Sequence, residues 1–300
     1  MDTVLVTGAT GFLGSHLVHA LLNEKFEVVI LKRSTSDIWR IADIINKVES
    51  YDVDRHEVDK AFVENEIDIV IHTACNYGRK GESIKSIVET NILFGLEVLE
   101  CSINHNNITF INTDTFFNND KLLQKHLNIY TRSKKQFVEW LQLFSDKIQV
   151  VNLKLQHIYG PKDSLNKFVP WLTHQLFDQV DEIKLTEGKQ KRDFIFIKDV
   201  VSAYITIIRN REQLNNFSNF DVGTGNLVSL KRFVECMRNV YQKEAGETNT
   251  LLNFGAIPYR ENEIMNIEVE NQGLKNLGWT PIFSIKEGLQ NLIKEFQYKS

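Results

Sequence analysis

A glycine-rich turn separates two apolar segments at the start of the chain. The run Val4-Leu5-Val6 predicts a buried strand, and the apolar side chains of residues 13–21 share one face of a helix. Gly8, Gly11 and Gly14 lie in the turn between the strand and the helix. A tight turn, a close approach of the backbone to a ligand and a helix packed on a strand each exclude a Cβ atom. Together with a second apolar run, residues 1–31 therefore predict a βαβ unit.

Three later apolar runs continue this pattern. They cover residues 67–72, 108–112 and 149–155 and alternate with helical patterns. Short apolar strands that alternate with helices are typical of a parallel sheet covered on both faces. We therefore expect an α/β fold of the Rossmann type, a doubly wound parallel sheet with a smaller C-terminal substrate-binding lobe.

The βα rhythm ends after residue 160, which indicates where the second lobe begins. We expect residues 1–160 to form the dinucleotide-binding domain, with residues 196–226 packed back on it and one more helix at residues 199–208. Residues 161–195 and 227–300 form the expected second lobe.

The composition argues against several kinds of partner. The formal net charge is −4, whereas a nucleic-acid or anionic-membrane partner requires a basic footprint. No apolar run approaches the roughly 18 residues of a membrane span, and the first residues lack a signal-peptide pattern. Cys75, Cys101 and Cys236 form no Cys-x-x-Cys pair, which argues against a disulfide framework and a zinc site. We expect a cytoplasmic protein without a metal site.

The glycine turn also predicts a dinucleotide cofactor. A helix N-terminus directly after such a turn offers N–H groups and a positive dipole end to a pyrophosphate. In NAD-binding folds an acid at the end of the second strand binds the ribose hydroxyls, but this chain has Lys32 and Arg33 there. A guanidinium pairs with a 2′-phosphate. The sequence therefore favours NADP(H) over NAD(H), although two solvated surface cations would give the same pattern.

The chain contains one Tyr-x-x-x-Lys pair, Tyr130 and Lys134, at the start of the helix expected after the strand at 108–112. The spacing places both side chains on one helical face, near the carboxyl ends of the strands, where ligands bind in such sheets. A cation at this distance is expected to favour the phenolate and to lower the tyrosine pKa. The pair thus predicts a general acid or base.

Together these residues resemble the extended short-chain dehydrogenase/reductase family, also described as NAD-dependent epimerases/dehydratases, which acts on nucleotide sugars. Further matching motifs run along the whole chain. They are Ile71-His72-Thr73-Ala74, Asn91, His157-Ile158-Tyr159-Gly160-Pro161, Arg192-Asp193-Phe194-Ile195 and Leu277-Gly278-Trp279-Thr280-Pro281.

The resemblance implies a role for each matching residue. Thr113 takes the catalytic Ser/Thr position, Tyr130 is the acid/base, and Lys134 holds the nicotinamide ribose. The cofactor-binding positions are Gly8, Thr10, Gly11, Phe12, Leu13, Gly14, Lys32, Arg33, Asp52, Val53, Thr73, Ala74, Asn91, Tyr130, Lys134 and His157. The positions that contact the nucleotide sugar are Thr113, Asp114, Thr115, Lys167, Arg192 and Arg260. Arg192 could instead pair with Asp193, and Arg260 could belong to a solvated charge cluster.

The segment Thr113-Asp114-Thr115 distinguishes between reactions. In the 4,6-dehydratases that this family includes, the corresponding run is Thr-Asp-Glu, and its Glu removes the C5 proton of the sugar. A threonine hydroxyl cannot abstract that proton without a further base, so Thr115 disfavours dehydration. The segment and the residues around His157 are most similar to the CDP-abequose and CDP-paratose synthases, which reduce the C4 ketone of a CDP-linked 4-keto-3,6-dideoxyhexose.

The leading hypothesis is therefore an NADP-dependent 4-ketoreductase of a nucleotide-linked deoxysugar, as in the biosynthesis of surface polysaccharides such as O antigen. An NAD-dependent nucleotide-sugar 4-epimerase is an alternative within the same fold, and Lys32 and Arg33 argue mildly against it. A non-catalytic NADP-sensing regulator is an alternative of another class, but it would not need Thr113, Tyr130 and Lys134 together. The resemblance also implies a homodimer.

Overall fold

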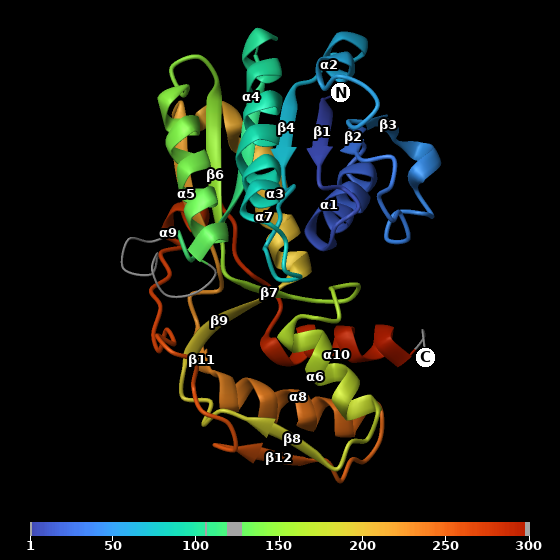
Figure 1. Ribbon diagram of the computed structural model, residues 1–300, viewed down its shortest axis with the longest axis vertical. Coiled ribbons are helices and arrows are strands. Elements are labelled where there is room, and N and C mark those ends of the chain that lie inside the picture. The colour runs from blue at the N-terminus through green and yellow to red at the C-terminus, as the bar shows by residue number, and fades with distance from the viewer. Residues whose placement is uncertain (1, 106, 119–127, 298–300) are drawn as a thin grey trace.

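The computed structural model describes residues 2–105, 107–118 and 128–297. Its centre is a seven-stranded sheet in the order β10-β6-β5-β4-β1-β2-β3 (Figure 1), and all its neighbouring strands are parallel. The strands are β1 (Thr3–Thr7), β2 (Glu27–Lys32), β3 (Glu49–Asp52), β4 (Ile69–His72), β5 (Thr109–Thr115), β6 (Gln149–Leu155) and β10 (Phe217–Val222). The predicted Rossmann-type parallel sheet is confirmed.

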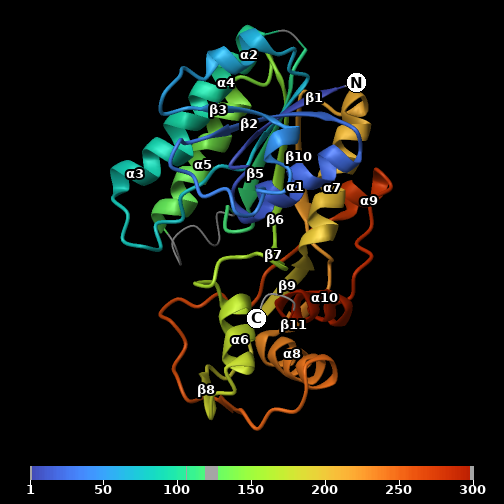
Figure 2. The same ribbon diagram turned by 90° about the vertical axis from the view of Figure 1, so that its right-hand side faces the viewer.

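Helices cover both faces of this sheet. Figure 2 shows α1 and α7 on one side and α4 and α5 on the other. Val4 and Val6 of β1 belong to the core beneath α1 and α7, whereas Leu5 belongs to the core beneath α4 and α5. Because both faces are covered, the strands are apolar at consecutive positions instead of alternating. The helices are α1 (Phe12–Asn23), α2 (Asp59–Glu64), α4 (Phe94–Asn104), α5 (Asn128–Leu143) and α7 (Ile197–Asn210).

Two elements differ from a simple reading of the sequence. The edge strand β3 has the sequence Glu-Ser-Tyr-Asp and buries Tyr51 alone, so it shows no apolar run. The helix expected to begin near Ile84 has three parts: α3 (Ile84–Val88), the π-helical turn η2 (Glu89–Leu93) and α4. A π-helical turn often lies at a functional site, and this one contains the buried Asn91.

The C-terminal part of the chain forms a second layer below the sheet in Figure 1. It contains a three-stranded sheet, β11-β9-β7, and a two-stranded sheet, β12-β8. Its strands are β7 (His157–Tyr159), β8 (Glu182–Leu185), β9 (Lys191–Phe196), β11 (Leu227–Ser229) and β12 (Leu251–Phe254). Its helices are α6 (Phe168–Phe177), α8 (Leu230–Glu244) and α10 (Ile285–Gln297), whereas the short helix α9 (Gln272–Asn276) packs on β10 of the central sheet. Short helical turns η1 (Ile45–Lys47) and η3 (Arg211–Gln213) complete the described elements.

Asp199 in the first turn of α7 connects this lobe to the sheet. Its two carboxylate oxygens accept hydrogen bonds from the backbone N–H groups of Ile282 and Phe283, at 2.9 and 3.1 Å. The indole N–H of Trp279 donates to Ser202, also on α7, at 2.9 Å. The Leu277–Pro281 motif therefore docks the C-terminal segment on α7. Within the described ranges, none of the helices has the length and apolar character needed to cross a lipid bilayer.

Candidate active site

The glycine turn after β1 provides a close approach to the backbone. Gly8 has a φ of +67°, and a Cβ atom there would lie 2.7 Å from the backbone nitrogen of Ala74. A Cβ atom on Gly14 would lie 2.2 Å from the carbonyl oxygen of Gly8. Helix α1 begins after Gly11, which has no side chain to cap the first N–H groups. These groups are therefore available to a phosphate, so the turn fits a dinucleotide pyrophosphate.

A hydrogen-bonded set of side chains joins this turn to the end of β4. The Thr7 hydroxyl accepts a hydrogen bond from the N–H of Ala74 at 3.2 Å and lies 3.0 Å from His72 Nδ1. The Thr73 hydroxyl donates to the Thr7 carbonyl at 2.7 Å. His72 is fully buried among the rings of Phe94, Phe110 and Phe137, and burial lowers its pKa to about 3. His72 is therefore neutral, and its Nδ1 shares one hydrogen bond with the Thr7 hydroxyl.

This buried imidazole predicts acid lability. The pKa of His72 rises from about 3 in the folded state to about 6.5 in the unfolded state, so the unfolded state binds more protons between these values. Stability is therefore lost as pH falls below 6.5, by about 2 kcal/mol at pH 5 from His72 alone. We expect urea unfolding at pH 7 and pH 5 to show this loss. In His72→Gln, the difference in the free energy of unfolding between pH 7 and pH 5 should be smaller by about that amount. An unchanged difference would contradict the assignment of this loss to His72.

At the end of β2 two of the predicted cofactor residues pair with each other. The Lys32 ammonium forms an ion pair with the Asp52 carboxylate, and both side chains are largely buried. The backbone N–H of Val53 donates to the Lys32 carbonyl at 2.9 Å. The Arg33 side chain next to this pair is exposed. The charge of Lys32 is thus compensated locally, and Arg33 presents its guanidinium to solvent.

Tyr130 and Lys134 lie on the buried face of α5, where both side chains are at least 95% inaccessible to solvent. The Tyr130 phenol is hydrogen-bonded to the Thr115 hydroxyl, and its ring lies 4.8 Å from the ring of Tyr77. Burial raises the Tyr130 pKa well above its ordinary value, and the Thr115 hydrogen bond and Arg79 oppose the rise only partly. The expected lowering of the pKa is therefore wrong, because burial, together with Cys75 and Asp114, outweighs the Thr115 hydrogen bond and Arg79. Such a phenol keeps its proton at neutral pH and suits a proton donor.

Lys134 lies in the same buried region. Burial lowers the pKa of its ammonium, while the nearby Asp114 and Cys75 raise it.

Asn91, on the π-helical turn, donates to Ser133 of α5 at 2.9 Å and to the backbone of Asn76 at 2.9 Å. The π-helical turn therefore fastens the loop after β4 to the helix that carries the Tyr130–Lys134 pair.

The three residues at the end of β5 point to different partners. Thr113 Oγ1 lies 2.7 Å from the hydroxyl of Tyr204 on α7, whereas Thr115 reaches Tyr130. Asp114 between them is buried on the opposite face, where its carboxylate accepts hydrogen bonds from Asn118 at 2.8 Å and Asn152 at 3.1 Å. Burial raises the pKa of Asp114. Successive residues of a strand point to opposite faces, which separates Asp114 from the two threonines.

The second lobe supplies further predicted residues. The His157 ring packs on Phe116, 4.5 Å away, and on Phe194, 5.8 Å away, and burial lowers its pKa to about 3. The Lys167 ammonium lies 3.0 Å from Asp163 and 5.3 Å from the centre of the Phe12 ring. Lys167 thus brings the second lobe next to the glycine turn.

The two predicted substrate arginines have different surroundings. Arg192 pairs with Glu263 and donates to the Ile264 carbonyl at 2.5 Å. Asp193 instead accepts hydrogen bonds from the turn at Thr224, at 2.7 and 3.1 Å, so it does not serve as the partner considered for Arg192. Arg260 is exposed in the loop that also carries Glu263.

Sequence reasoning missed Tyr77, Arg79 and Tyr204. Tyr77 and Arg79 follow β4 in a segment without periodicity, and Tyr204 lies 91 residues after Thr113 in an apolar helix. Proximity to Ala74 was an available signal for the first two, but Tyr204 reads as an ordinary core residue.

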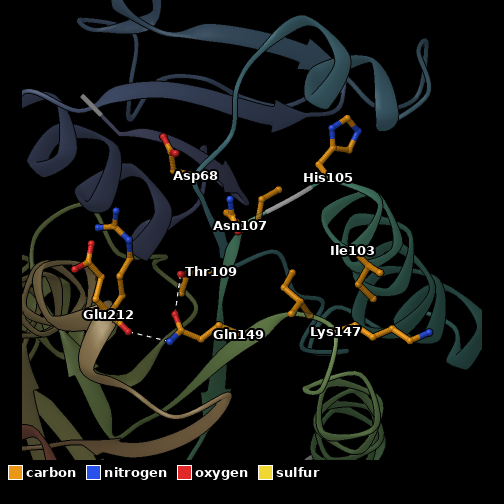
Figure 3. Close-up of a pocket in the computed structure, with 11 residues that line it drawn as sticks. Asp68, Ile103, His105, Asn107, Thr109, Lys147, Gln149 and Glu212 are labelled. Atoms are coloured by element: carbon orange, nitrogen blue, oxygen red, sulfur yellow. Dashed lines mark hydrogen bonds between the residues drawn. The ribbon is translucent and has the colours of Figure 1, made fainter.

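The cavity in Figure 3 lies at the amino ends of the strands, at the other end of the sheet from the candidate site. Its volume is about 550 Å³, and it is bordered by Asp68, Thr109 and Gln149 at the amino ends of β4, β5 and β6. Gln149 accepts a hydrogen bond from Thr109 at 2.8 Å and donates to the carbonyl of Arg211 at 2.8 Å. Since ligands of open parallel sheets bind at the carboxyl ends, this cavity is separate from the candidate site.

The comparisons with known proteins cover nearly the whole chain. The NAD dependent epimerase/dehydratase family matches residues 4–223. A CDP-abequose synthase of Salmonella typhimurium is 35% identical over 297 residues, which cover 98% of each chain. A CDP-abequose synthase of Salmonella muenchen is 30% identical over 295 residues, 97% of this chain and 96% of that one.

Solved structures share the fold at lower identity. The UDP-glucose 4-epimerase of Thermotoga maritima with UDP-glucose has a TM-score of 0.82 at 21% identity and covers 99% of both chains. The UDP-glucuronic acid 4-epimerase of Bacillus cereus, in complex with UDP-glucuronic acid and NAD, also has a TM-score of 0.82 at 21% identity, with 99% of this chain and 100% of that chain covered.

Proposed function

Because this chain belongs to the NAD dependent epimerase/dehydratase family of extended short-chain dehydrogenases/reductases, as its motifs predict, we propose that it is a nucleotide-sugar 4-ketoreductase. Its substrate would be a nucleotide-linked 4-keto-deoxyhexose with CDP as the nucleotide, and its cofactor NADPH. The two CDP-abequose synthases, similar over nearly the full length, support this substrate class.

One observation carries the choice of reaction. The side chain hydrogen-bonded to the Tyr130 phenol is the Thr115 hydroxyl, at the position where a dehydratase of this family has its carboxylate. The nearest acid in sequence, Asp114, lies near Lys134, and its carboxylate accepts hydrogen bonds from Asn118 and Asn152. A site with a protonated phenol and threonine hydroxyls can donate hydrogen bonds and a proton to a ketone oxygen. Among the residues that the structure describes, no carboxylate or imidazole takes the place of Thr115 beside the phenol as a base for removing a proton from carbon.

The chain's own residues then have the following roles. Tyr130 gives its proton to the C4 oxygen, and Thr113 donates a hydrogen bond to the same oxygen. The ammonium of Lys134 stabilises the phenolate that remains. The bound cofactor supplies the hydride. The residues proposed to contact the nucleotide sugar are Asp114, Lys167, Arg192 and Arg260. Arg192 would bind a phosphate of the substrate either in place of Glu263 or together with it.

The cofactor would lie against the turn after β1. The Cβ-free backbone at Gly8 and Gly14 and the uncapped start of α1 suit its pyrophosphate. Thr10, Phe12, Leu13, Thr73, Ala74, Asn91 and His157 remain proposed contacts around it. The ammonium of Lys134 suits the hydroxyls of the nicotinamide ribose, and Lys32, Arg33, Asp52 and Val53 surround the proposed adenosine end.

Arg33 is the residue proposed to select NADP(H). Arg33→Ala should weaken NADP binding by about 1–3 kcal/mol, the scale of a hydrogen bond to a charged group, and leave NAD binding nearly unchanged. Isothermal titration calorimetry with both cofactors measures this difference. Arg55→Ala is the matched control, because Arg55 is also an exposed cation beside Asp52. Equal losses for NADP and NAD in Arg33→Ala would contradict a role in reading the 2′-phosphate.

Product analysis tests the proposed reaction. The protein should oxidise one NADPH for each CDP-4-keto-3,6-dideoxyhexose consumed, as measured by absorbance and product NMR. A dTDP-linked 4-keto-6-deoxy sugar tests the choice of nucleotide. The alternative 4-epimerase would interconvert two C4 epimers of an intact nucleotide sugar without net loss of NADPH, and that outcome would replace the reductase assignment.

We also propose a homodimer formed through α4 and α5. Leu93, which precedes α4, and Trp140 and Leu143 of α5 are 55%, 42% and 65% exposed. These helices lie side by side in Figure 1, so the exposed apolar side chains suit a second copy of the chain. Sedimentation equilibrium should give a dimer mass, and Trp140→Glu should shift it to a monomer. Ile282→Glu, at a 77% exposed site on the C-terminal segment, should not. A monomeric unmodified protein would refute the proposal.

A further inference from the structure

We propose that Tyr204 is a positioning residue that turns the hydroxyl hydrogen of Thr113 toward the oxygen of the substrate. This inference deepens the proposed function and rests on it. Tyr204 lies on α7, on the opposite side of the sheet from Tyr130, and its hydroxyl lies 2.7 Å from Thr113 Oγ1. Tyr204 is fully buried, whereas Thr113 is only partly buried at the end of β5. Thr113 can therefore face the site and Tyr204 at once.

The surroundings of Tyr204 make Thr113 its partner. The helix packs its buried face, which includes Val200, Ala203 and Ile207, into the apolar core beneath the sheet. A phenol hydroxyl buried in such a core needs a hydrogen-bond partner, since an unpaired one is costly. Burial also raises the Tyr204 pKa, so the phenol is neutral and carries its hydrogen at neutral pH.

The chemistry of the two hydroxyls sets the direction of the bond. A phenol is more acidic than an aliphatic alcohol and is therefore the better donor, so Tyr204 donates and Thr113 accepts. Thr113 has a single hydrogen, and this direction leaves that hydrogen free to point away from Tyr204. A ketone oxygen only accepts hydrogen bonds. The opposite direction would present lone pairs of Thr113 to the ketone and oppose its polarisation.

The site thus contains two phenol–threonine pairs at the end of β5. Tyr130 of α5 pairs with Thr115, and Tyr204 of α7 pairs with Thr113. The two pairs differ in access, because Tyr204 has no exposed surface and touches the core. Tyr204 therefore acts through Thr113, whereas Tyr130 is the proposed proton donor.

A double-mutant cycle tests this role. Tyr204→Phe should lower kcat about fivefold to tenfold, the loss expected for one hydrogen bond, with the KM for NADPH unchanged. In a Thr113→Val background the same substitution should lower kcat no further, because the hydroxyl that Tyr204 orients is gone. In a Thr113→Ser background, which keeps a hydroxyl, the effect should return. Tyr159→Phe is the matched control, since Tyr159 is equally buried and its hydroxyl donates to the Ile285 carbonyl in the second lobe; it should leave kcat unchanged.

Two results would overturn the proposal. One is a Tyr204→Phe effect of equal size with and without the Thr113 hydroxyl, which indicates a purely structural role, and the other is no effect at all. A second cycle on the equilibrium constant of urea unfolding tests the hydrogen bond without substrate, and an absence of coupling there would also refute it. The kinetic cycle can use any nucleotide-sugar reaction that the protein catalyses. Failure of the reductase assignment, seen as an absence of NADPH oxidation, is therefore distinct from failure of the coupling.

Discussion

Tyr130→Phe should lower turnover by roughly 10²–10⁴-fold, the contribution typical of a positioned general acid, and leave NADPH affinity nearly unchanged. The phenylalanine ring keeps the packing against Tyr77, 4.8 Å away, while the group that transfers the proton is lost. Burial keeps the Tyr130 phenol protonated, so its hydroxyl is ready to give a proton. The phenylalanine that replaces it has no such proton. Stopped-flow or steady-state loss of NADPH absorbance measures turnover, and fluorescence titration measures cofactor affinity.

A matched variant separates the loss of the proton donor from a disturbed site. Tyr77→Phe removes the neighbouring phenol hydroxyl and preserves the same ring stack, so it should affect turnover far less. Near-normal turnover in Tyr130→Phe would exclude Tyr130 from the mechanism. A similar fall in both variants would indicate that the Tyr77 hydroxyl is needed as much as the Tyr130 hydroxyl, and the loss would then not identify Tyr130 as the proton donor.

Dehydration is the second reaction for which a large difference is expected. Incubation with CDP-glucose and NAD should give no 4-keto-6-deoxy product, although preformed 4-keto-deoxysugar is reduced. Elimination across C5 and C6 needs a base at C5 in addition to the groups that act at C4. Thr115 provides a hydroxyl of very high pKa at this position, and Asp114 is directed to Asn118 and Asn152. Mass spectrometry of the products and NMR of the C5 proton in deuterated buffer measure the two steps.

The substitution Thr115→Glu tests whether the missing carboxylate sets the reaction. We expect it to give slow exchange of the C5 proton with solvent, whereas Thr115→Gln, which has the same shape and no basic oxygen, should give none. Because Thr115 is buried, the pKa of the new carboxyl will be raised, so the exchange should increase with pH. Exchange of the C5 proton by the unmodified protein would mean that another base exists, and the reductase assignment would then be wrong.

The sequence was sufficient for local features of the site. The glycine turn and the Tyr130–Lys134 pair depend on spacings of a few residues, so periodicity and turn chemistry predict where they lie. The parallel sheet followed from apolar runs that alternate with helices. The edge strand β3 escaped this reasoning because it buries one residue of four.

Features that depend on distant residues could not be predicted. The Thr113–Tyr204 contact joins residues 91 positions apart, and the Arg192–Glu263 pair joins residues 71 positions apart. The pKa of Tyr130 is raised and not lowered as expected, because the sequence shows the neighbouring lysine but not the depth of burial. Lys32 illustrates the same limit. The sequence does not show a partner for its ammonium, and in the structure Asp52, 20 positions away, forms an ion pair with it.

The contact between Asp199 and the backbone of Ile282 and Phe283 affects how this protein can exchange parts with its relatives. A recombinant chain that changes parent near residue 227 would take the buried carboxylate from one protein and the two N–H groups that satisfy it from another. Backbone donors do not depend on side-chain identity, but their position depends on the loop around Trp279. A recombinant chain should therefore take the C-terminal segment and α7 from the same parent, even though the residues in contact are 80 or more positions apart in the chain. Helix α7 also carries Tyr204, so a mismatch that shifts this helix would also shift the partner of Thr113 at the end of β5.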